Sequence, residues 1–164
     1  MFFVEIFAVG GVFRDKAQIY LLSAGDDVNN ILTSCILLNA RSLRNKIPEL
    51  HMLLQDVKPQ IAFITESWLD SSITDGLIDP NGSYAVYRHD RLHRVGGGVM
   101  ALVSVSMHSY QIKMPQQFSH IEAECFEVIT HFGKCRFIVL YRPPKFNALG
   151  RQNMAQLYDC LCYL

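Results

Sequence analysis

The stretch LTSCILLNARSLRNKIPELHMLLQDVKPQIAFITES, residues 32–67, decides the fold. It begins with an apolar run at 32–38 and ends with another at 60–65, and both have the length of strands buried on two faces. Between them, apolar residues recur every three or four positions, which predicts a helix over 45–57. Strand, helix and strand make a βαβ unit with a parallel strand pair, so we expect a mixed α/β protein.

The sequence also indicates where this helix begins and ends. Asn45 is the expected N-cap. Pro48 falls in the first turn, where its missing N–H would have no partner within the helix. Lys58-Pro59 ends the helix, because the residue before a proline avoids the helical conformation.

The second half of the chain predicts a mostly antiparallel sheet. The polar stretch 70–83 is typical of a long surface loop, and its Asp79-Pro80-Asn81-Gly82 sequence is a strong turn signal. Gly133-Lys134 is the expected hairpin turn between the last two strands. An apolar stripe after Asn153 predicts a closing helix. The strand-like segments lie at 84–89, 98–103, 124–132 and 135–142.

Length and composition indicate one globular domain. The chain has 164 residues, of which 50% are apolar and 18% charged. Residues 1–30 differ from the rest in sequence pattern, with the pairs Gly10-Gly11 and Asp26-Asp27. We therefore treat them as a leader of uncertain order and place a single domain over 31–164. The formal net charge is zero, so any contact with a polyanion has to come from a local cluster of cations.

Cysteine usage and the start of the chain bear on the compartment. The five cysteines are scattered and form no C-x-x-C pair, which favours a reducing environment. The apolar segment 1–13 contains Glu5 and lacks a basic start, unlike a signal peptide. No apolar run approaches the ~20 residues of a membrane-spanning helix. We therefore expect an intracellular protein, nuclear or cytoplasmic, that is not secreted and has no membrane partner.

Asn39 and Glu66 are the first candidate site residues, because each follows a strand of the expected parallel pair. Ligands of open α/β sheets gather at this edge, and a carboxylate beside a carboxamide could hold a hard cation such as magnesium. The alternative is structural: Asn39 caps the following turn and Glu66 accepts hydrogen bonds from loop amides. Spacing alone favours the structural alternative.

A second candidate region begins at Tyr141-Arg142-Pro143-Pro144, where the prolines end a strand. Tyr141 and Arg142 could donate hydrogen bonds to a phosphate, or Tyr141 could be a half-buried edge residue. The surrounding stretch 133–151 contains no acidic residue. Its cations, Lys145 and Arg142 among them, make it the best candidate surface for an anion.

A basic loop, 88–94, is the third candidate region and contains Arg88 and Arg91. Gly96-Gly97-Gly98 follows it, but no Lys-Ser/Thr comes after these glycines, so they do not predict a phosphate-binding loop. We expect the triglycine to allow a bulge or a close approach of backbone.

Five segments stand in the order seen in a known family. The chain resembles, over about residues 33–164, the endonuclease domain of jockey-like non-LTR retrotransposons. That domain belongs to the endonuclease/exonuclease/phosphatase superfamily, which includes DNase I and the apurinic endonucleases. The segments are Leu38-Asn39-Ala40-Arg41-Ser42-Leu43, Thr65-Glu66-Ser67-Trp68-Leu69, Tyr87-Arg88-His89-Asp90-Arg91, Gly96-Gly97-Gly98-Val99 and Tyr141-Arg142-Pro143-Pro144.

This resemblance implies a DNase I-like four-layer α/β sandwich and a magnesium-dependent phosphodiesterase that nicks DNA for retrotransposition. Asn39 would orient the phosphate and the metal environment, Glu66 would bind Mg²⁺, and Tyr141 would lie near the scissile phosphate. From the two clusters of cations we expect Arg88, Arg91, Arg142 and Lys145 to contact DNA, in a weak and salt-sensitive manner.

The sequence departs from the family in one respect. Gly-Asp-x-Asn and Ser-Asp-His motifs, which in the family supply aspartates and the catalytic histidine, are not found in it. We therefore expect a domain truncated to about its first half to two thirds, with self-association through an uncovered sheet face at 98–103 and 137–141. The alternative is a catalytically inactive retrotransposon remnant with at most weak nucleic-acid or partner binding.

Overall fold

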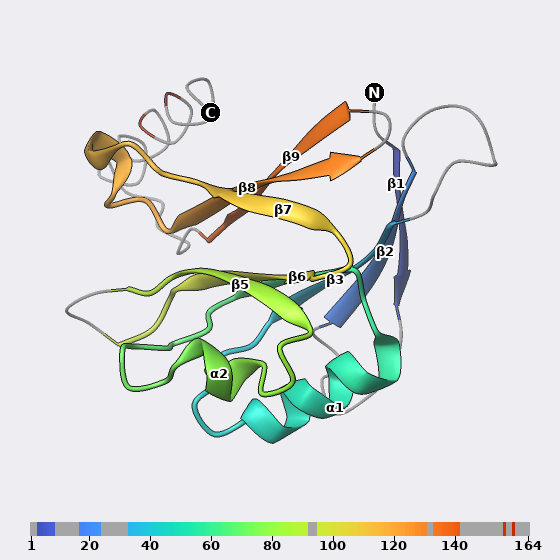
Figure 1. The fold of residues 1–164 in the computed structure, drawn as a ribbon. Helices are drawn as coiled ribbons and strands as arrows, with labels where there is room; N and C mark the ends of the chain where they lie inside the picture. Colours follow the sequence, from blue (N-terminus) through green and yellow to red (C-terminus); the bar gives the residue numbers. More distant parts are fainter. Residues whose placement is uncertain are drawn as a thin grey trace.

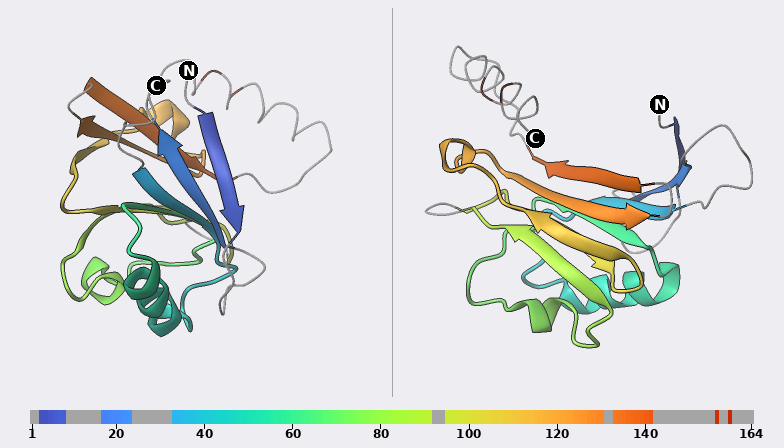
Figure 2. Two further views of the ribbon diagram at one scale, coloured as in Figure 1. Left: turned by 90° about the vertical axis from the view of Figure 1, so that its right-hand side faces the viewer. Right: turned by 45° about the horizontal axis from the view of Figure 1, so that its top comes forward.

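The computed structural model describes residues 3–8, 17–23, 33–91, 95–130 and 133–141, together with Gln156 and Asp159. Its described elements form three layers, with two helices below a six-stranded sheet and a three-stranded sheet above it (Figure 1). Figure 2 gives the same layers from two further sides. This arrangement confirms the mixed α/β class.

The six-stranded sheet has the strand order β1-β2-β3-β4-β6-β5. Only β3 and β4 are parallel; every other neighbouring pair is antiparallel. The predicted βαβ unit is thus confirmed as β3, α1 and β4. The strands are β1 (Phe3–Ala8), β2 (Ala17–Ser23), β3 (Thr33–Asn39), β4 (Ile61–Thr65), β5 (Tyr84–His89) and β6 (Val99–Ser104).

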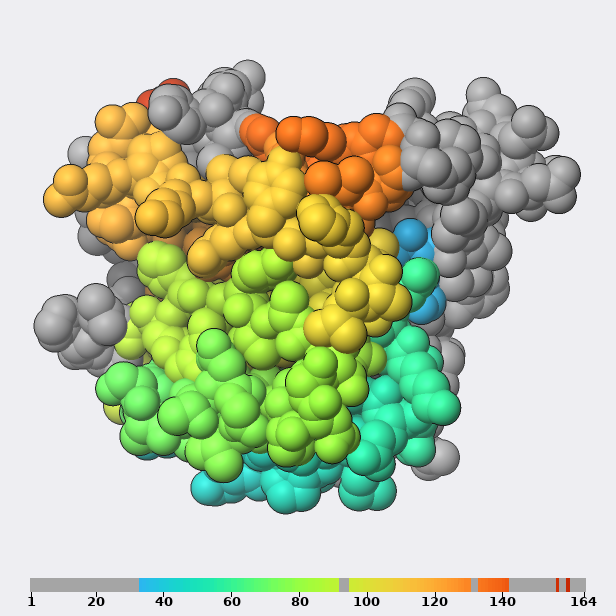
Figure 3. Space-filling view, in the orientation of Figure 1, coloured from blue at the N-terminus to red at the C-terminus, as the bar shows by residue number. Residues whose placement is uncertain are grey.

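The second sheet is antiparallel and has the order β7-β8-β9. Its strands are β7 (His108–Ile112), β8 (Ala123–Thr130) and β9 (Gly133–Leu140). The helices are α1 (Ile47–Val57), α2 (Asp75–Ile78) and the short 3-10 turn η1 (Gln116–Phe118). In the space-filling view the chain around β5, in green, and the chain around β7, in yellow, meet along a continuous boundary (Figure 3).

Helix α1 begins one residue later than an Asn45 cap would require. Lys46 is the N-cap, and no side chain caps the helix, so the predicted Asn45 cap is wrong. The Lys46 ammonium instead donates to the carbonyl oxygens of Ala40 at 2.7 Å and Arg41 at 3.0 Å. Pro48 does lie in the first turn, and Lys58 ends the helix in a left-handed conformation.

Four further features differ from the sequence-based expectations. Strands β1 and β2 form within residues 1–30, and β7 forms where no strand was predicted. Short helix α2 interrupts the expected loop, because its Ile78 is fully buried. Gly133-Lys134 is not the hairpin turn: Gly133 pairs with Thr130 inside the ladder. The closing helix predicted after Asn153 lies outside the described residues.

Two apolar cores hold the layers together. The first lies between the helices and the six-stranded sheet, and joins Leu50 and Leu54 of α1 to strand residues such as Ile36 and Ile64. The second lies between the two sheets and centres on Phe126, whose ring stacks on Tyr87 and Phe137 at centroid distances of 5.3 and 5.4 Å.

The expected uncovered sheet face is wrong for β6. Val99, Ala101 and Val103 pack into the core between the sheets, and the residues alternating with them pack toward the helices. All five side chains from 99 to 103 are fully buried, because the three-stranded sheet covers the face that the helices leave open. No helix within the described residues has the length and apolar character that a membrane crossing requires.

Replacing Phe126 by alanine should lower the free energy of unfolding by about 3–5 kcal/mol, because loss of a fully buried ring leaves a cavity between the sheets. Urea unfolding followed by circular dichroism measures the change. Val105→Ala is the control: its side chain is 63% exposed, so its effect should stay within about 0.5 kcal/mol. A similarly small effect of Phe126→Ala would contradict packing of the two sheets around this ring.

Candidate functional site

The carboxyl ends of the parallel strands bring Asn39 and Glu66 together, as the sequence predicts. Asn39 pairs with Thr65 in the β3–β4 register, and Glu66 is the next residue. The Asn39 side-chain amide donates to Glu66 Oε1 at 3.3 Å. Through Thr65 of β4, which pairs with both, the register places Asn39 in the same row as Val99, which faces the space between the sheets. The pair therefore opens toward the second sheet.

Tyr141 reaches the same carboxylate from the second sheet. Its backbone N–H donates to the carbonyl oxygen of Glu122 at 2.9 Å, which continues the β8–β9 ladder by one residue pair. Its hydroxyl donates to Glu66 Oε1 at 2.7 Å. The side chains of Asn39, at the end of β3, and Tyr141, after β9, thus converge on one oxygen atom of Glu66, the residue after β4.

The backbone around this cluster is strained. Arg41, Ser42, Glu66 and Trp68 all have positive φ values, of 43°, 80°, 52° and 55°. A left-handed conformation costs a residue with a side chain on the order of 1–3 kcal/mol and persists only where the surroundings over-determine it. Here the Ser42 N–H donates to the Glu66 carbonyl oxygen at 2.9 Å, which ties the two strained loops together. Strain concentrated in this way is typical of a functional site.

The triglycine lies against the same loops. Trp68 donates its backbone N–H to the Gly97 carbonyl oxygen at 3.0 Å. Gly97 has a φ of 73°, and a Cβ built on it would lie 2.2 Å from Arg91 Cζ. The guanidinium therefore crosses the glycine backbone directly. The predicted close approach is confirmed.

Glu122 holds this assembly in place, although no sequence pattern predicted it. Its Oε2 accepts the Gly98 N–H at 2.9 Å, and its Oε1 accepts Arg91 Nε. Arg91 Cζ in turn lies 6.0 Å from the centroid of the Tyr141 ring. The one available signal was an acidic residue at the entry to an apolar strand, and no motif contains it.

Arg88 is not part of the cluster. It pairs in register with Met100, so it lies on the helix side of the sheet, opposite to Asn39. Its guanidinium donates to the Ile73 carbonyl oxygen at 2.7 Å, to the Asp70 carbonyl oxygen at 3.0 Å and to the Asp90 carboxylate. These contacts anchor the loop 70–75, which leaves Arg88 a structural role within the described residues.

The predicted cation stretch 133–151 is described only in part. Arg136 Nε donates to Glu127 Oε1 at 2.9 Å, and Lys134 Nζ lies 3.9 Å from the other oxygen of this carboxylate. Both cations therefore share the one carboxylate of Glu127 on the outer face of the second sheet. Arg142 and Lys145 lie outside the described residues.

Burial and the Glu66 carboxylate control the protonation of Tyr141. Desolvation, followed by the hydrogen bond to Glu66 and the negative charge of that group, raises the pKa of the phenol to about 12. At neutral pH the hydroxyl is consequently a hydrogen-bond donor and not a base.

The oxygen atoms of the cluster suit a hard cation. Asn39 Oδ1 is buried without a hydrogen-bond partner in the described part of the chain, and the Glu66 carboxylate accepts the hydrogen bonds of Asn39 and Tyr141 on Oε1. Carboxylate and amide oxygens are ligands that Mg²⁺ accepts. Over the described ranges, no three His, Cys, Asp or Glu side chains gather closely enough to hold a metal ion. Asn39 and Glu66 thus fit an ion that keeps most of its water.

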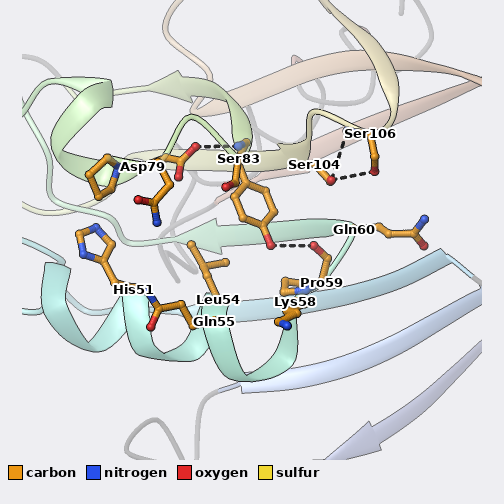
Figure 4. Close-up of a pocket in the computed structure, with 13 residues that line it drawn as sticks. His51, Leu54, Gln55, Lys58, Pro59, Gln60, Asp79, Ser83, Ser104 and Ser106 are labelled. Carbon is orange, nitrogen blue, oxygen red and sulfur yellow. Dashed lines mark hydrogen bonds between the residues drawn. The ribbon is translucent and has the colours of Figure 1, made fainter.

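A groove of about 420 Å³ lies where Pro59-Gln60 enters β4, at the other end of that strand from Glu66 (Figure 4). His51 lies on its wall and donates from Nε2 toward the carbonyl oxygens of Leu77 and Ile78, at 3.1 and 3.0 Å. None of the candidate site residues that the sequence predicts lines this groove.

No protein-family model matches this chain, and no curated protein matches it either.

Gly97→Ala should destabilise the protein more than Gly82→Ala, although both glycines have similar φ values of 73° and 63°. A Cβ at Gly82 meets nothing within 4 Å, so this control carries only the left-handed strain of about 1–2 kcal/mol. A Cβ at Gly97 would overlap the Arg91 guanidinium and displace it from Glu122. Urea unfolding midpoints compare the variants, and equal midpoints would contradict the close approach.

The Tyr141 phenol should titrate near pH 12, and Glu66→Gln should lower this pKa, because the carboxylate stabilises the neutral phenol. NMR of ¹³C-labelled tyrosine measures it, with Tyr141→Phe assigning the resonance. An unfolded phenol ionises near pH 10, so this group's contribution to stability is complete below pH 10 and falls as the pH rises toward 12. The same titration midpoint in both proteins would exclude the Glu66 contact.

Proposed function

We propose that the cluster of Asn39, Glu66 and Tyr141 is the phosphate and metal site of a magnesium-dependent phosphodiesterase that nicks DNA. The supporting observation is that Asn39 and Tyr141, from two different sheets, both donate to one oxygen of the Glu66 carboxylate. They are also the residues whose motifs resemble the endonuclease domain of jockey-like retrotransposons, in which such nicking serves retrotransposition.

The chemistry of each side chain suits this reaction. Tyr141 keeps its proton at neutral pH and can donate a hydrogen bond to a phosphoryl oxygen. The Asn39 amide can orient the same group. Mg²⁺ held by Glu66 and Asn39 would polarise the phosphate and stabilise the charge that grows on its oxygens. The strained loops fix these groups before a substrate arrives, which lowers the reorganisation needed in the transition state.

The layers support a DNase I-like sandwich as the finer fold assignment. Two sheets pack face to face over a shared apolar core, and helices cover the outer face of the larger sheet. The cluster lies where the carboxyl ends of the parallel pair meet the end of β9. Ligands of α/β sheets gather at the carboxyl ends of parallel strands.

Binding of DNA without cleavage is the second candidate function. The observation in its favour is that Glu122, the other carboxylate close to Tyr141, is neutralised by Arg91. Among the described residues that meet at this site, Glu66 is then the carboxylate left to hold a metal ion. In either case we expect weak association with DNA that falls steeply as salt rises, because phosphate contacts release condensed counterions.

Relaxation of supercoiled plasmid in the presence of Mg²⁺ tests the proposal. The wild-type chain should convert plasmid to open circles, and Glu66→Gln should abolish this conversion. Tyr141→Phe should slow it by about 10²–10³-fold, the usual effect of losing one transition-state donor. Glu127→Gln is the control, because this carboxylate lies on the outer face of β8, against Arg136.

Fluorescence anisotropy with labelled duplex DNA, measured across salt concentrations, separates the two candidates. Salt-sensitive binding by a wild-type chain that never nicks plasmid would favour binding without cleavage. Nicking that survives Glu66→Gln would contradict the assignment of the site.

A further inference from the structure

A pocket of about 320 Å³ lies beside the candidate site. Trp68, two residues after Glu66, forms one wall, and Arg91 forms another. Arg91 also approaches the Tyr141 ring, so it separates the pocket from the cluster around Glu66. The proposed function makes no use of this pocket. Its remaining walls include Arg44, Asp70, Val95 and Gly96.

The indole of Trp68 is held as a rigid wall. Its backbone is in the left-handed conformation and donates its N–H to the Gly97 carbonyl oxygen at 3.0 Å. Gly96 packs against the ring: a Cβ at that position would be only 3.8 Å from Trp68 Nε1 and Cε2. A large aromatic side chain in a strained and pinned backbone is already ordered before binding, so a ligand that stacks on it need not order it.

The charges around the pocket balance. Arg44 forms an ion pair with Asp70 at 2.8 Å, and Arg91 is paired with Glu122. No described cation on its wall is left without an acidic partner, so the pocket offers little attraction to a phosphate. Val95, which is 86% exposed, adds an apolar edge. An indole face, guanidinium groups and an apolar edge suit a flat, neutral and aromatic ligand.

We propose that this pocket binds a nucleobase of the DNA strand, which stacks on Trp68 while the neighbouring phosphate lies at Glu66 and Tyr141. The inference rests on the proposed function for the position of the phosphate. Stacking on an indole tolerates any base, because every base presents a π face, and it anchors the strand without reading sequence through hydrogen bonds.

Trp68 is the single tryptophan of the chain, so its fluorescence reports on this pocket directly. Titration with a short single-stranded oligonucleotide should quench the emission in a saturable manner. An oligonucleotide of the same length with abasic sites throughout, and inorganic phosphate, should leave the emission unchanged. The measurement uses the unaltered chain and therefore does not depend on the folding of a variant.

Fluorescence anisotropy of a labelled oligonucleotide measures how much Trp68 contributes to the free energy of binding. Trp68→Ala should weaken binding by roughly 5–150-fold, which corresponds to about 1–3 kcal/mol for one stacked base. Trp68→Phe keeps an aromatic face and should lose less. For the abasic oligonucleotide, the affinities of the wild type and Trp68→Ala should agree.

The outcomes separate this inference from the proposed function. Binding of the base-containing oligonucleotide without quenching, or with the affinity of the abasic one, would overturn the nucleobase pocket and leave the phosphate site standing. Quenching should persist in Glu127→Gln, because this carboxylate lies on the outer face of β8 and away from the pocket, and its loss there would overturn the assignment to Trp68. Quenching by a chain that never cleaves DNA would support the pocket and reject the phosphodiesterase.

Discussion

The Glu66 carboxylate links the two sheets through hydrogen bonds. Its Oε1 accepts a hydrogen bond from Asn39 of the six-stranded sheet and another from Tyr141 at the end of the three-stranded sheet. The apolar core around Phe126 presses the sheets together but has no direction, whereas these two hydrogen bonds fix how the ends of β3 and β9 face each other. The position of Tyr141 therefore depends on how the two sheets pack.

Hydrogen bonds offset the backbone strain of the loops around Glu66. Four residues that carry side chains, Arg41, Ser42, Glu66 and Trp68, adopt left-handed conformations within two short loops. Backbone hydrogen bonds between the loops and to the triglycine compensate them, and Glu122 secures the triglycine in turn through the Gly98 N–H. A loop strained in this way is stable only as part of the whole set. The strained loops lower the stability of the protein, but they hold the Glu66 carboxylate, the Trp68 indole and the Arg91 guanidinium in place.

Sequence patterns predicted what depends on neighbours along the chain. The βαβ unit and the meeting of Asn39 with Glu66 follow from periodicity and from the geometry of a parallel pair. Strand β7 was not predicted, because its polar residues obscure the alternation of apolar and polar positions. The role of Glu122 was not predicted either, because its hydrogen-bond partners lie 24 and 31 residues away in the sequence. The strand end before the prolines, and then the resemblance, predicted Tyr141, but its contact with Glu66 spans 75 residues and depends on how the sheets pack. No local pattern contains that information.

The two arginines of the basic loop illustrate why counting cations does not locate an anion site. Arg88 and Arg91 are three residues apart, yet the alternation of side chains along β5 places Arg88 on the helix side of the sheet. There its guanidinium donates to Asp90 and to two carbonyl oxygens. The Arg91 guanidinium passes over the Gly97 backbone and reaches the site, but its charge is paired with the Glu122 carboxylate. A paired guanidinium still offers a flat, polarisable face. Its place between Trp68 and Tyr141 therefore suits it to shaping the site and stacking on a base more than to binding a phosphate.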